Sequence, residues 1–378
     1  MSTPTSTTPP THCAVIGAGL VGTLCAAMLS SRGYTVDLYD ARSDPRLSPI
    51  AIAARSINLA LSPRGIEALR SVNEELVERV LADSLPMRGR MLHHKPGKEG
   101  GETRTEGQDY GVVEEGECIN SISRTGLGIA LLDHLDGLPR EGRGSVRTHF
   151  NTKLVEMDMR KEKGVSVTLG TKEGSSKVDF DFVIGADGAY NLTSSKVTLA
   201  TPTSSSPSLP DPIQHSQSVQ TISTSGPAEN SCSSLSPTSF VPLLPPSSRT
   251  VIREANSRPH PSLHQDKSFT LTLFAPQEQF DSIDALIAEG KTPNPVVELF
   301  EKEFPDALKL MGEEQLLKDW RDNPKDGLIT IECSPYHFKD KALLIGDASH
   351  GMVPFYGTIL PIYLHANPDP VTSHQAKE

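Results

Sequence analysis

Three glycines near the start of the chain have the spacing of a phosphate-binding turn. Gly17, Gly19 and Gly22 form a G-x-G-x-x-G pattern. The first glycine permits a tight turn, the second lets the backbone approach a pyrophosphate, and the third lets a helix pack closely on a strand. Asp40 follows at the distance where a carboxylate accepts hydrogen bonds from ribose hydroxyls. Together these residues predict a dinucleotide-binding site; the alternative is a glycine-tightened turn without a ligand.

The flanking segments supply the elements that this pattern requires. The apolar run His12–Ile16 predicts a buried strand, and Leu20–Ser31 predicts a helix that stops at Gly33. A second strand is expected at Thr35–Tyr39, directly before the acidic residue. The N-terminus of the helix offers free N–H groups to the phosphates. The sequence therefore predicts an α/β fold that begins with a compact β-α-β unit.

Two later strands are also expected to end in small residues and a carboxylate. Asp187 and Gly188 follow the apolar run Phe182–Ile184, and Asp347 follows Ala342–Ile345 and Gly346. Each pattern alone is a common turn at the end of a strand. Together with the first glycine pattern they fit a flavin site assembled from distant segments, in which Asp347 binds the ribityl or ribose region. A further helix is expected to open at Ser62-Pro63 with one apolar face: Ile66, Leu69, Leu76 and Val80.

Composition excludes some classes of function. The 378 residues include 36 basic and 47 acidic side chains, a net charge of −11 without a basic patch, so we expect no nucleic-acid partner. The five cysteines lack metal-ligand spacing, which favours a reduced, intracellular protein. The apolar runs are too short to span a membrane, so the chain as written is expected to be soluble.

Four segments carry a resemblance to a known family. They read V-I-G-A-G-L-V-G at 15–22, L-Y-D-A-R at 38–42, R-S-I-N-L-A-L-S-P-R-G at 55–65 and P-M-R-G-R-M at 86–91. Taken alone, 55–61 predicts only a half-buried strand. Together the segments resemble the kynurenine 3-monooxygenase family of FAD-dependent aromatic hydroxylases, over about 11–190 and about 267–357. The resemblance implies a Rossmann-like FAD-binding domain of the aromatic-hydroxylase type and a β-sheet substrate domain.

The resemblance also implies a reaction. In that family FAD is reduced by NADPH and reacts with O2 to give a flavin C4a-hydroperoxide, which hydroxylates L-kynurenine to 3-hydroxy-L-kynurenine in tryptophan degradation and quinolinate-dependent NAD biosynthesis. The flavin carries the chemistry, so no catalytic side chain and no metal are expected. The family also implies association with the mitochondrial outer membrane, although no anchor is visible in this sequence.

Individual residues take expected roles from the same resemblance. Arg90 and Tyr110 match the positions that hold the substrate, where an arginine can clamp a carboxylate. Arg124 would pair with the flavin pyrophosphate, whereas the residues alone favour an exposed arginine at the end of a strand. The full set expected against FAD is Gly17, Gly19, Val21, Gly22, Tyr39, Asp40, Ala41, Arg42, Ala60, Arg124, Leu154 and Asp347.

The resulting domain plan departs from the family in two places. Segment 191–267 is rich in Ser, Thr and Pro and is expected to be disordered, where the family has a Ser-x-x-Arg element and sheet strands. After Gly357 the family has a Gln-Gly-Met-Asn helix start, and here Thr358 begins a divergent segment. The plan is a tail at 1–11, an FAD-binding domain at 12–190 with a substrate-contacting segment at 84–112, disorder at 191–267, a remnant substrate domain at 268–340, a second FAD segment at 341–357 and a divergent tail at 358–378.

We hypothesise that both departures arise from reading-frame or splicing differences, which sequencing of the mature transcript tests. We therefore expect an incomplete substrate domain and no helical C-terminal region. Two alternatives to the hydroxylase remain open at this point. One is a truncated, non-catalytic FAD-binding relative, and the other is a nicotinamide-dependent dehydrogenase, which needs the same glycines and Asp40.

Overall fold

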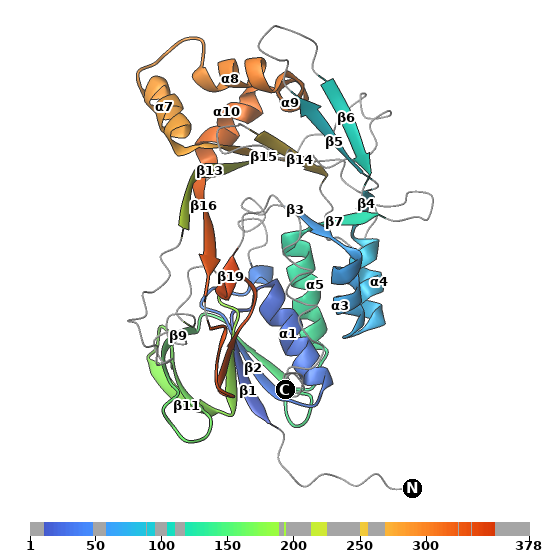
Figure 1. The fold of residues 1–378 in the computed structure, drawn as a ribbon, viewed down its shortest axis with the longest axis vertical. Coiled ribbons are helices and arrows are strands. Elements are labelled where there is room, and N and C mark those ends of the chain that lie inside the picture. Colours follow the sequence, from blue (N-terminus) through green and yellow to red (C-terminus); the bar gives the residue numbers. More distant parts are fainter. Residues whose placement is uncertain are drawn as a thin grey trace, which may run out of the picture.

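The computed structural model describes residues 11–47, 58–87, 89–94, 104–109, 118–188, 193, 213–224, 250–255, 269–323, 325–333 and 335–351. Two sheets organise these residues along the long axis of the molecule (Figure 1). The lower part in this view contains a six-stranded sheet and the upper part a five-stranded one. In the described ranges no helix is long and apolar enough to cross a membrane.

The six-stranded sheet contains the β-α-β unit expected from the sequence. β1 (His12–Ile16), α1 (Leu20–Ser31) and β2 (Thr35–Tyr39) have the predicted bounds. Both strands are almost wholly buried, as is usual for central strands of a parallel sheet. The strand order is β17 (His337–Phe338), β18 (Ala342–Leu344), β12 (Phe182–Gly185), β1, β2 and β8 (Val146–His149). All neighbours are parallel except β17 and β18.

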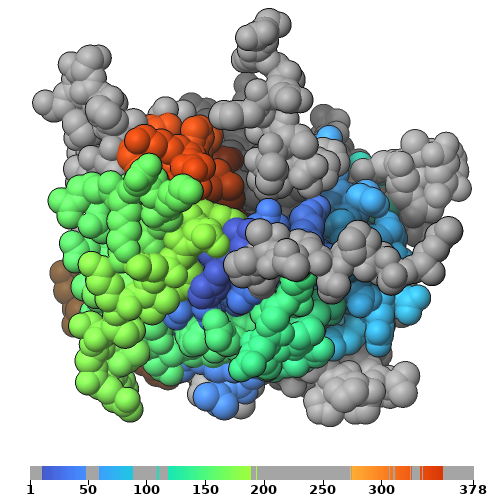
Figure 2. Space-filling model, turned by 90° about the horizontal axis from the view of Figure 1, so that it is seen from below, coloured from blue at the N-terminus to red at the C-terminus, as the bar shows by residue number. Residues whose placement is uncertain are grey.

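Different layers cover the two faces of this sheet. Cys13 and Val15 point to α1 and α5 (Arg124–Asp136), whereas Ala14 and Ile16 pack against an antiparallel three-stranded sheet. This alternation is the period of two that a strand imposes on its side chains. The small sheet consists of β9 (Lys153–Asp158), β10 (Val165–Gly170) and β11 (Ser175–Phe180). Figure 2 shows the blue N-terminal residues between the green small-sheet residues and the light-blue helices.

The single helix expected after Ser62 is two helices, α3 (Pro63–Arg70) and α4 (Glu74–Ala82). The Ser62 hydroxyl accepts a hydrogen bond from Gly65 N at 3.4 Å, as expected of an N-cap. Asn73 then adopts an extended backbone, and its side chain accepts from Glu75 N at 2.7 Å. The apolar period runs across this break because Leu69, Leu76 and Val80 still share one cluster, so periodicity alone concealed the second N-cap.

Shorter strands connect the two parts of the molecule. β3 (Asn58–Leu61), β7 (Ile119–Ser123) and β4 (Leu85–Met87) form one small sheet, and β5 (Gly89–His94) pairs with β6 (Arg104–Asp109). Two short 3-10 helices, η1 (Pro45–Leu47) and η3 (Gly346–Ala348), lie in loops.

The upper sheet has the order β14 (Thr250–Ala255), β15 (Phe269–Pro276), β13 (Ile213–Thr224), β16 (Lys325–Glu332) and β19 (His350–Gly351). Four helices lie above it in Figure 1: α7 (Gln277–Ala288), α8 (Pro295–Glu303), α9 (Pro305–Met311) and α10 (Glu313–Asp322). Leu273 and Ala275 of β15 pack into one cluster with Phe280, Phe300 and Trp320 of these helices.

This sheet corrects the expectation of disorder over 191–267, because β13 and β14 both lie within that segment. Residues 217–224 pair in register with 269–276, and 250–255 pair with 269–274. Neither stretch contains proline, and both contain β-branched Ile, Val and Thr, which suit a pleated surface. The composition of the whole segment concealed these two stretches, so the upper sheet contains strands that we expected to be missing.

Candidate cofactor site

The glycine turn between β1 and α1 is closed on two sides by the chain's own backbone. Gly17 has a φ of 109°, and a Cβ there would lie 2.3 Å from Ala186 O. A Cβ on Gly22 would lie 1.9 Å from Gly17 O. At Gly19, by contrast, no atom of the described residues comes within 4 Å of a Cβ position. Gly17 and Gly22 are therefore required by close contacts within the protein, whereas Gly19 faces open space where a ligand can approach.

The N-terminus of α1 opens into the same space. Gly19 is the N-cap residue with an extended backbone, and within the described residues no side chain caps the helix. The first turn also contains no acidic residue. The first N–H groups of a helix have no partners inside the helix and carry partial positive charge. This end of α1 is thus suited to a phosphate or pyrophosphate.

Asp40 lies beside the glycine turn. Its Oδ2 accepts a hydrogen bond from Ala18 N at 2.9 Å, and its Oδ1 accepts one from Arg42 N at 2.8 Å. The Arg42 guanidinium donates to both oxygens, at 3.0 and 2.8 Å. Burial alone would raise the pKa of Asp40, but the Arg42 and Ala18 hydrogen bonds outweigh it and hold this pKa below its usual range. An ionised acceptor is therefore fixed next to the turn.

Asp347 reaches the site from the other end of the chain. The preceding Gly346 packs on Val21 in the first turn of α1, where a Cβ on the glycine would lie 3.2 Å from both valine methyls. Burial raises the pKa of Asp347, and electrostatic interactions with Arg124 and His350 partly offset this effect. Arg124 is exposed and is the first residue of α5, after the N-cap Ser123. One carboxylate and one cation from distant segments thus lie near the start of α1.

The end of β12 completes the cluster of strand ends. Ala186 N donates to Ile16 O at 2.7 Å, which places Ala186 against Gly17. The Asp187 carboxylate accepts from Thr193 N at 3.2 Å and from Thr193 Oγ1 at 2.9 Å. Neighbouring parallel strands β18, β12, β1 and β2 end at one edge of the sheet, which is where α/β proteins bind ligands. The strand ends named in the sequence thus lie at one edge, and their binding of a flavin stays a prediction.

Comparison with known proteins identifies the family. A family model described as an NAD(P)-binding Rossmann-like domain matches residues 15–72. The kynurenine 3-monooxygenase of Yarrowia lipolytica is 38% identical over 346 residues, which cover 91% of this chain and 68% of that protein. The chain belongs to the kynurenine 3-monooxygenase family. Because the match covers 91% of the chain, most of segment 191–267 lies within it.

Other relatives agree with this membership. The kynurenine 3-monooxygenases of Saccharomyces cerevisiae and Drosophila willistoni are each 34% identical, and the chain covers 69% and 68% of them. Among solved structures, 2-methyl-3-hydroxypyridine-5-carboxylic acid oxygenase has a TM-score of 0.65 at 16% identity over 94% of this chain and 80% of that chain. The p-nitrophenol 4-monooxygenase of Pseudomonas putida has a TM-score of 0.62 at 15% identity over 93% and 76%. These two structures show the same fold.

The structure brings most of the residues expected from the kynurenine 3-monooxygenase resemblance to one edge of the sheet. Tyr39 and Leu154 differ from the others, because their side chains lie in the core between the six-stranded and three-stranded sheets. Ala41 is exposed, and Ala60 is half-buried in β3. The residues gathered around the turn are Gly17, Gly19, Val21, Gly22, Asp40, Arg42, Arg124 and Asp347.

The two expected substrate residues are not placed by the structure. Tyr110 and the Arg90 side chain lie outside the described residues, although the Arg90 backbone pairs with Gln108 in the β5–β6 hairpin. Sequence reasoning also missed the contact of Asp187 with Thr193, and a group of two histidines and an arginine around Asp37. The second omission had a signal, since an aspartate interrupts the otherwise apolar strand T-V-D-L-Y.

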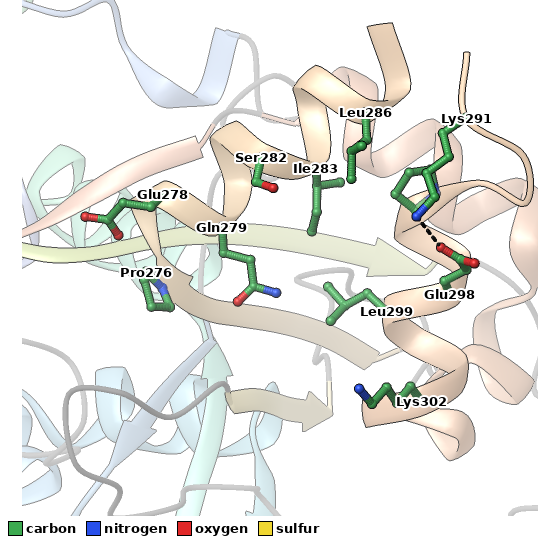
Figure 3. Close-up of a pocket in the computed structure, with 11 residues that line it drawn as sticks. Pro276, Glu278, Gln279, Ser282, Ile283, Leu286, Lys291, Glu298, Leu299 and Lys302 are labelled. Carbon is green, nitrogen blue, oxygen red and sulfur yellow. Dashed lines mark hydrogen bonds and ion pairs between the residues drawn. The ribbon is translucent and has the colours of Figure 1, made fainter. Parts of the chain in front are cut away.

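A hollow lies between α7 and α8 (Figure 3). Both helices belong to the upper part of the molecule in Figure 1. Ile283 and Leu299 line the hollow, and an ion pair of 3.2 Å joins Lys291 to Glu298 at one end. It shares no residue with the glycine turn or with the two carboxylates. This hollow therefore does not belong to the candidate cofactor site.

Proposed function

We propose that this protein is an FAD-dependent monooxygenase that converts L-kynurenine to 3-hydroxy-L-kynurenine with NADPH and O2. The observation that carries the proposal is the meeting of the open glycine turn, Asp40 and Asp347 in a chain of this family. NADPH supplies two electrons, one oxygen atom enters the aromatic ring, and the other leaves as water. Membership of a monooxygenase family disfavours the nicotinamide-dependent dehydrogenase.

The residues present fit FAD. The open space at Gly19 and the uncapped start of α1 suit the pyrophosphate, with Arg124 as a nearby cation. Asp40 suits the ribose hydroxyls, and Asp347 the ribityl chain or the second ribose. When bound, FAD supplies the transfer of electrons from NADPH and the activation of dioxygen. The protein's own groups bind and orient the cofactor, and we propose that Arg90 and Tyr110 hold the substrate.

A spectrum and a product assay test this proposal. The purified full chain is incubated with FAD and freed of excess cofactor, and its visible spectrum and kynurenine-dependent NADPH oxidation are then measured. The proposal expects flavin absorption bands and 3-hydroxykynurenine, identified by chromatography against a standard. Absence of flavin bands would refute FAD binding. Flavin bands without product would identify a non-catalytic FAD-binding relative instead. Asp347→Ala, prepared in parallel, provides the control for background oxidation.

We also propose, from the family alone, an intracellular location at the mitochondrial outer membrane. Fractionation of cells that express the tagged full chain tests this location. Recovery of the protein only in the cytosolic fraction would contradict it.

A further inference from the structure

Two histidines and an arginine surround Asp37, a buried residue in the middle of β2. This carboxylate contacts side chains of both neighbouring strands, β1 and β8. Burial alone would raise the pKa of Asp37, but hydrogen bonds from His149, Arg147 and His12 keep it far below its usual range. The donors are His12 Nε2 at 2.6 Å, His149 Nε2 at 2.8 Å, and Arg147 Nε and Nη2 at 2.9 and 3.1 Å.

The protonation of the two histidines at these contacts follows from the chemistry of the carboxylate. An ionised carboxylate has no proton to donate, so Nε2 of each histidine carries one. Both contacts are therefore charge-assisted hydrogen bonds, which are roughly twice as strong as neutral ones. The ring of His149 is consequently held by a strong bond at one edge.

His149 also contacts the residues that lead into the cofactor site. Its ring stacks on the buried ring of Tyr39, with 4.6 Å between centroids and 17° between planes. Its backbone oxygen accepts a hydrogen bond from Asp40 N at 2.9 Å. The ring of His149 is thus fixed by Asp37 and Tyr39, and its backbone oxygen binds Asp40, the residue that follows β2.

The residues after His149 also form hydrogen bonds with the chain around Asp40. Asn151 turns with a φ of 54°, and its N–H donates to Arg42 O at 2.9 Å. Thr152 N donates to Asp40 O at 2.9 Å. Both backbone groups of Asp40 are therefore bound by residues 149–152. Ligand-binding groups need to be held to within about half an ångström, which a fixed backbone provides.

We propose that His149 is a positioning residue for Asp40: supported by Asp37, it fixes the end of β2 so that the Asp40 carboxylate meets the adenosine ribose of the cofactor. The inference rests on the proposed binding of FAD. A merely structural role for the Asp37 group would instead stabilise the fold without a particular effect on the cofactor.

Three variants separate these roles. His149→Phe keeps a flat ring on Tyr39 but loses the hydrogen bond to Asp37, and His149→Gln keeps an N–H donor. His12→Phe removes a hydrogen bond to the same carboxylate from the opposite strand, away from residues 149–152. Each full-length variant is studied at a temperature where circular dichroism shows it to be folded. Dissociation constants for FAD and ADP are measured by fluorescence quenching and by competition.

The expected result is a selective effect. His149→Phe should weaken FAD and ADP about tenfold, because a displaced Asp40 carboxylate loses its hydrogen bond to the ribose, and His149→Gln should recover part of the affinity. His12→Phe should stay within about twofold of wild type, because it leaves the β8 hydrogen bonds intact. In the apoprotein, amide hydrogen exchange at 40–42 should be faster in His149→Phe than in wild type or His12→Phe.

Two results would overturn the inference without touching the proposed function. In the first, His149→Phe binds FAD and ADP as tightly as wild type and shows unchanged amide hydrogen exchange at 40–42. In the second, His149→Phe and His12→Phe weaken FAD and ADP binding equally, in proportion to the stability that each variant loses. A wild-type chain that binds neither FAD nor ADP would overturn the proposed function together with this inference.

Discussion

Replacement of Gly19 or Gly22 by alanine distinguishes a glycine that serves a ligand from one that serves the fold. Both lie in the same turn, and each variant adds a single methyl group. At Gly22 that methyl would lie 1.9 Å from Gly17 O, so α1 has to move away from β1. At Gly19, whose φ of −76° suits alanine, the methyl meets no described atom within 4 Å. The two variants should therefore fail in different ways.

The expected magnitudes follow from these contacts. Overpacking of this kind costs about 1–3 kcal/mol, and about 2–4 °C of Tm is lost per kcal/mol, so Gly22→Ala should lower the Tm by roughly 2–12 °C. Gly19→Ala loses only part of an N-cap preference, about 1 kcal/mol or less. Its methyl group, however, occupies the space where a pyrophosphate would approach the backbone. We expect FAD to bind at least about tenfold more weakly, a loss of about 1.4 kcal/mol.

Thermal unfolding of the apoproteins and FAD titration provide the two measurements. Wild-type FAD affinity in Gly19→Ala would show that no pyrophosphate lies over this residue. A Gly22→Ala apoprotein with the wild-type Tm would refute the close contact between helix and turn. Leu47→Ala, at an exposed position, provides a control for handling and purity.

Four other changes test separate parts of the molecule. The pKa of Asp40 is lower in the folded than in the unfolded protein, so its stabilising effect is full above the unfolded value of about 3.9 and is lost as pH falls through the folded value. Asp40→Asn should therefore be less stable than wild type at pH 7 in urea unfolding, with a difference that shrinks below about pH 4. Arg90→Lys should raise the KM for L-kynurenine about tenfold, with a smaller change in kcat, because lysine cannot clamp a carboxylate bidentately; an unchanged KM would remove Arg90 from the substrate site. Burial raises the pKa of the Cys13 thiol far above its usual range, so iodoacetamide at pH 8 should leave Cys13 unmodified in mass spectra until the protein is denatured. Trp320→Phe removes the indole N–H that donates to Asp284 (2.8 Å) and replaces the indole beneath the Lys325 ammonium (4.6 Å to its centroid) with a phenyl ring, a weaker cation–π partner, so it should cost about 1–2 kcal/mol in urea unfolding monitored by circular dichroism.

Local chemistry explains which parts of the fold were predictable. The bounds of β1, α1 and β2 follow from short apolar runs separated by glycines, and each of these signals acts within a few residues. The break between α3 and α4 was missed because the apolar period continues across it, and the only local sign of the break is the N-cap residue Asn73. β13 and β14 were missed because a segment's average composition does not show where its proline-free stretches lie.

In the candidate site, too, some residues were predictable from the sequence and others were not. Asp40 and Asp347 were predictable because each follows a buried strand, and parallel strands end at a common edge. The contacts of Asp37 were not, because they join residues 25 and 112 positions apart in the sequence. Such pairs depend on the register of β2 with β1 and β8, which the pattern of one strand does not specify.

The segment 342–351 belongs to both sheets of the molecule. β18 pairs with β12 in the lower sheet, and β19 pairs with β16 in the upper one, with Asp347 between them (Figure 1). A displacement of the upper sheet therefore reaches this carboxylate through a single short connection. By thermodynamic linkage, a ligand that binds Asp347 more tightly in one arrangement of the two sheets shifts the population toward that arrangement. Asp347, which we propose contacts the cofactor, thus lies in the short connection between the two sheets.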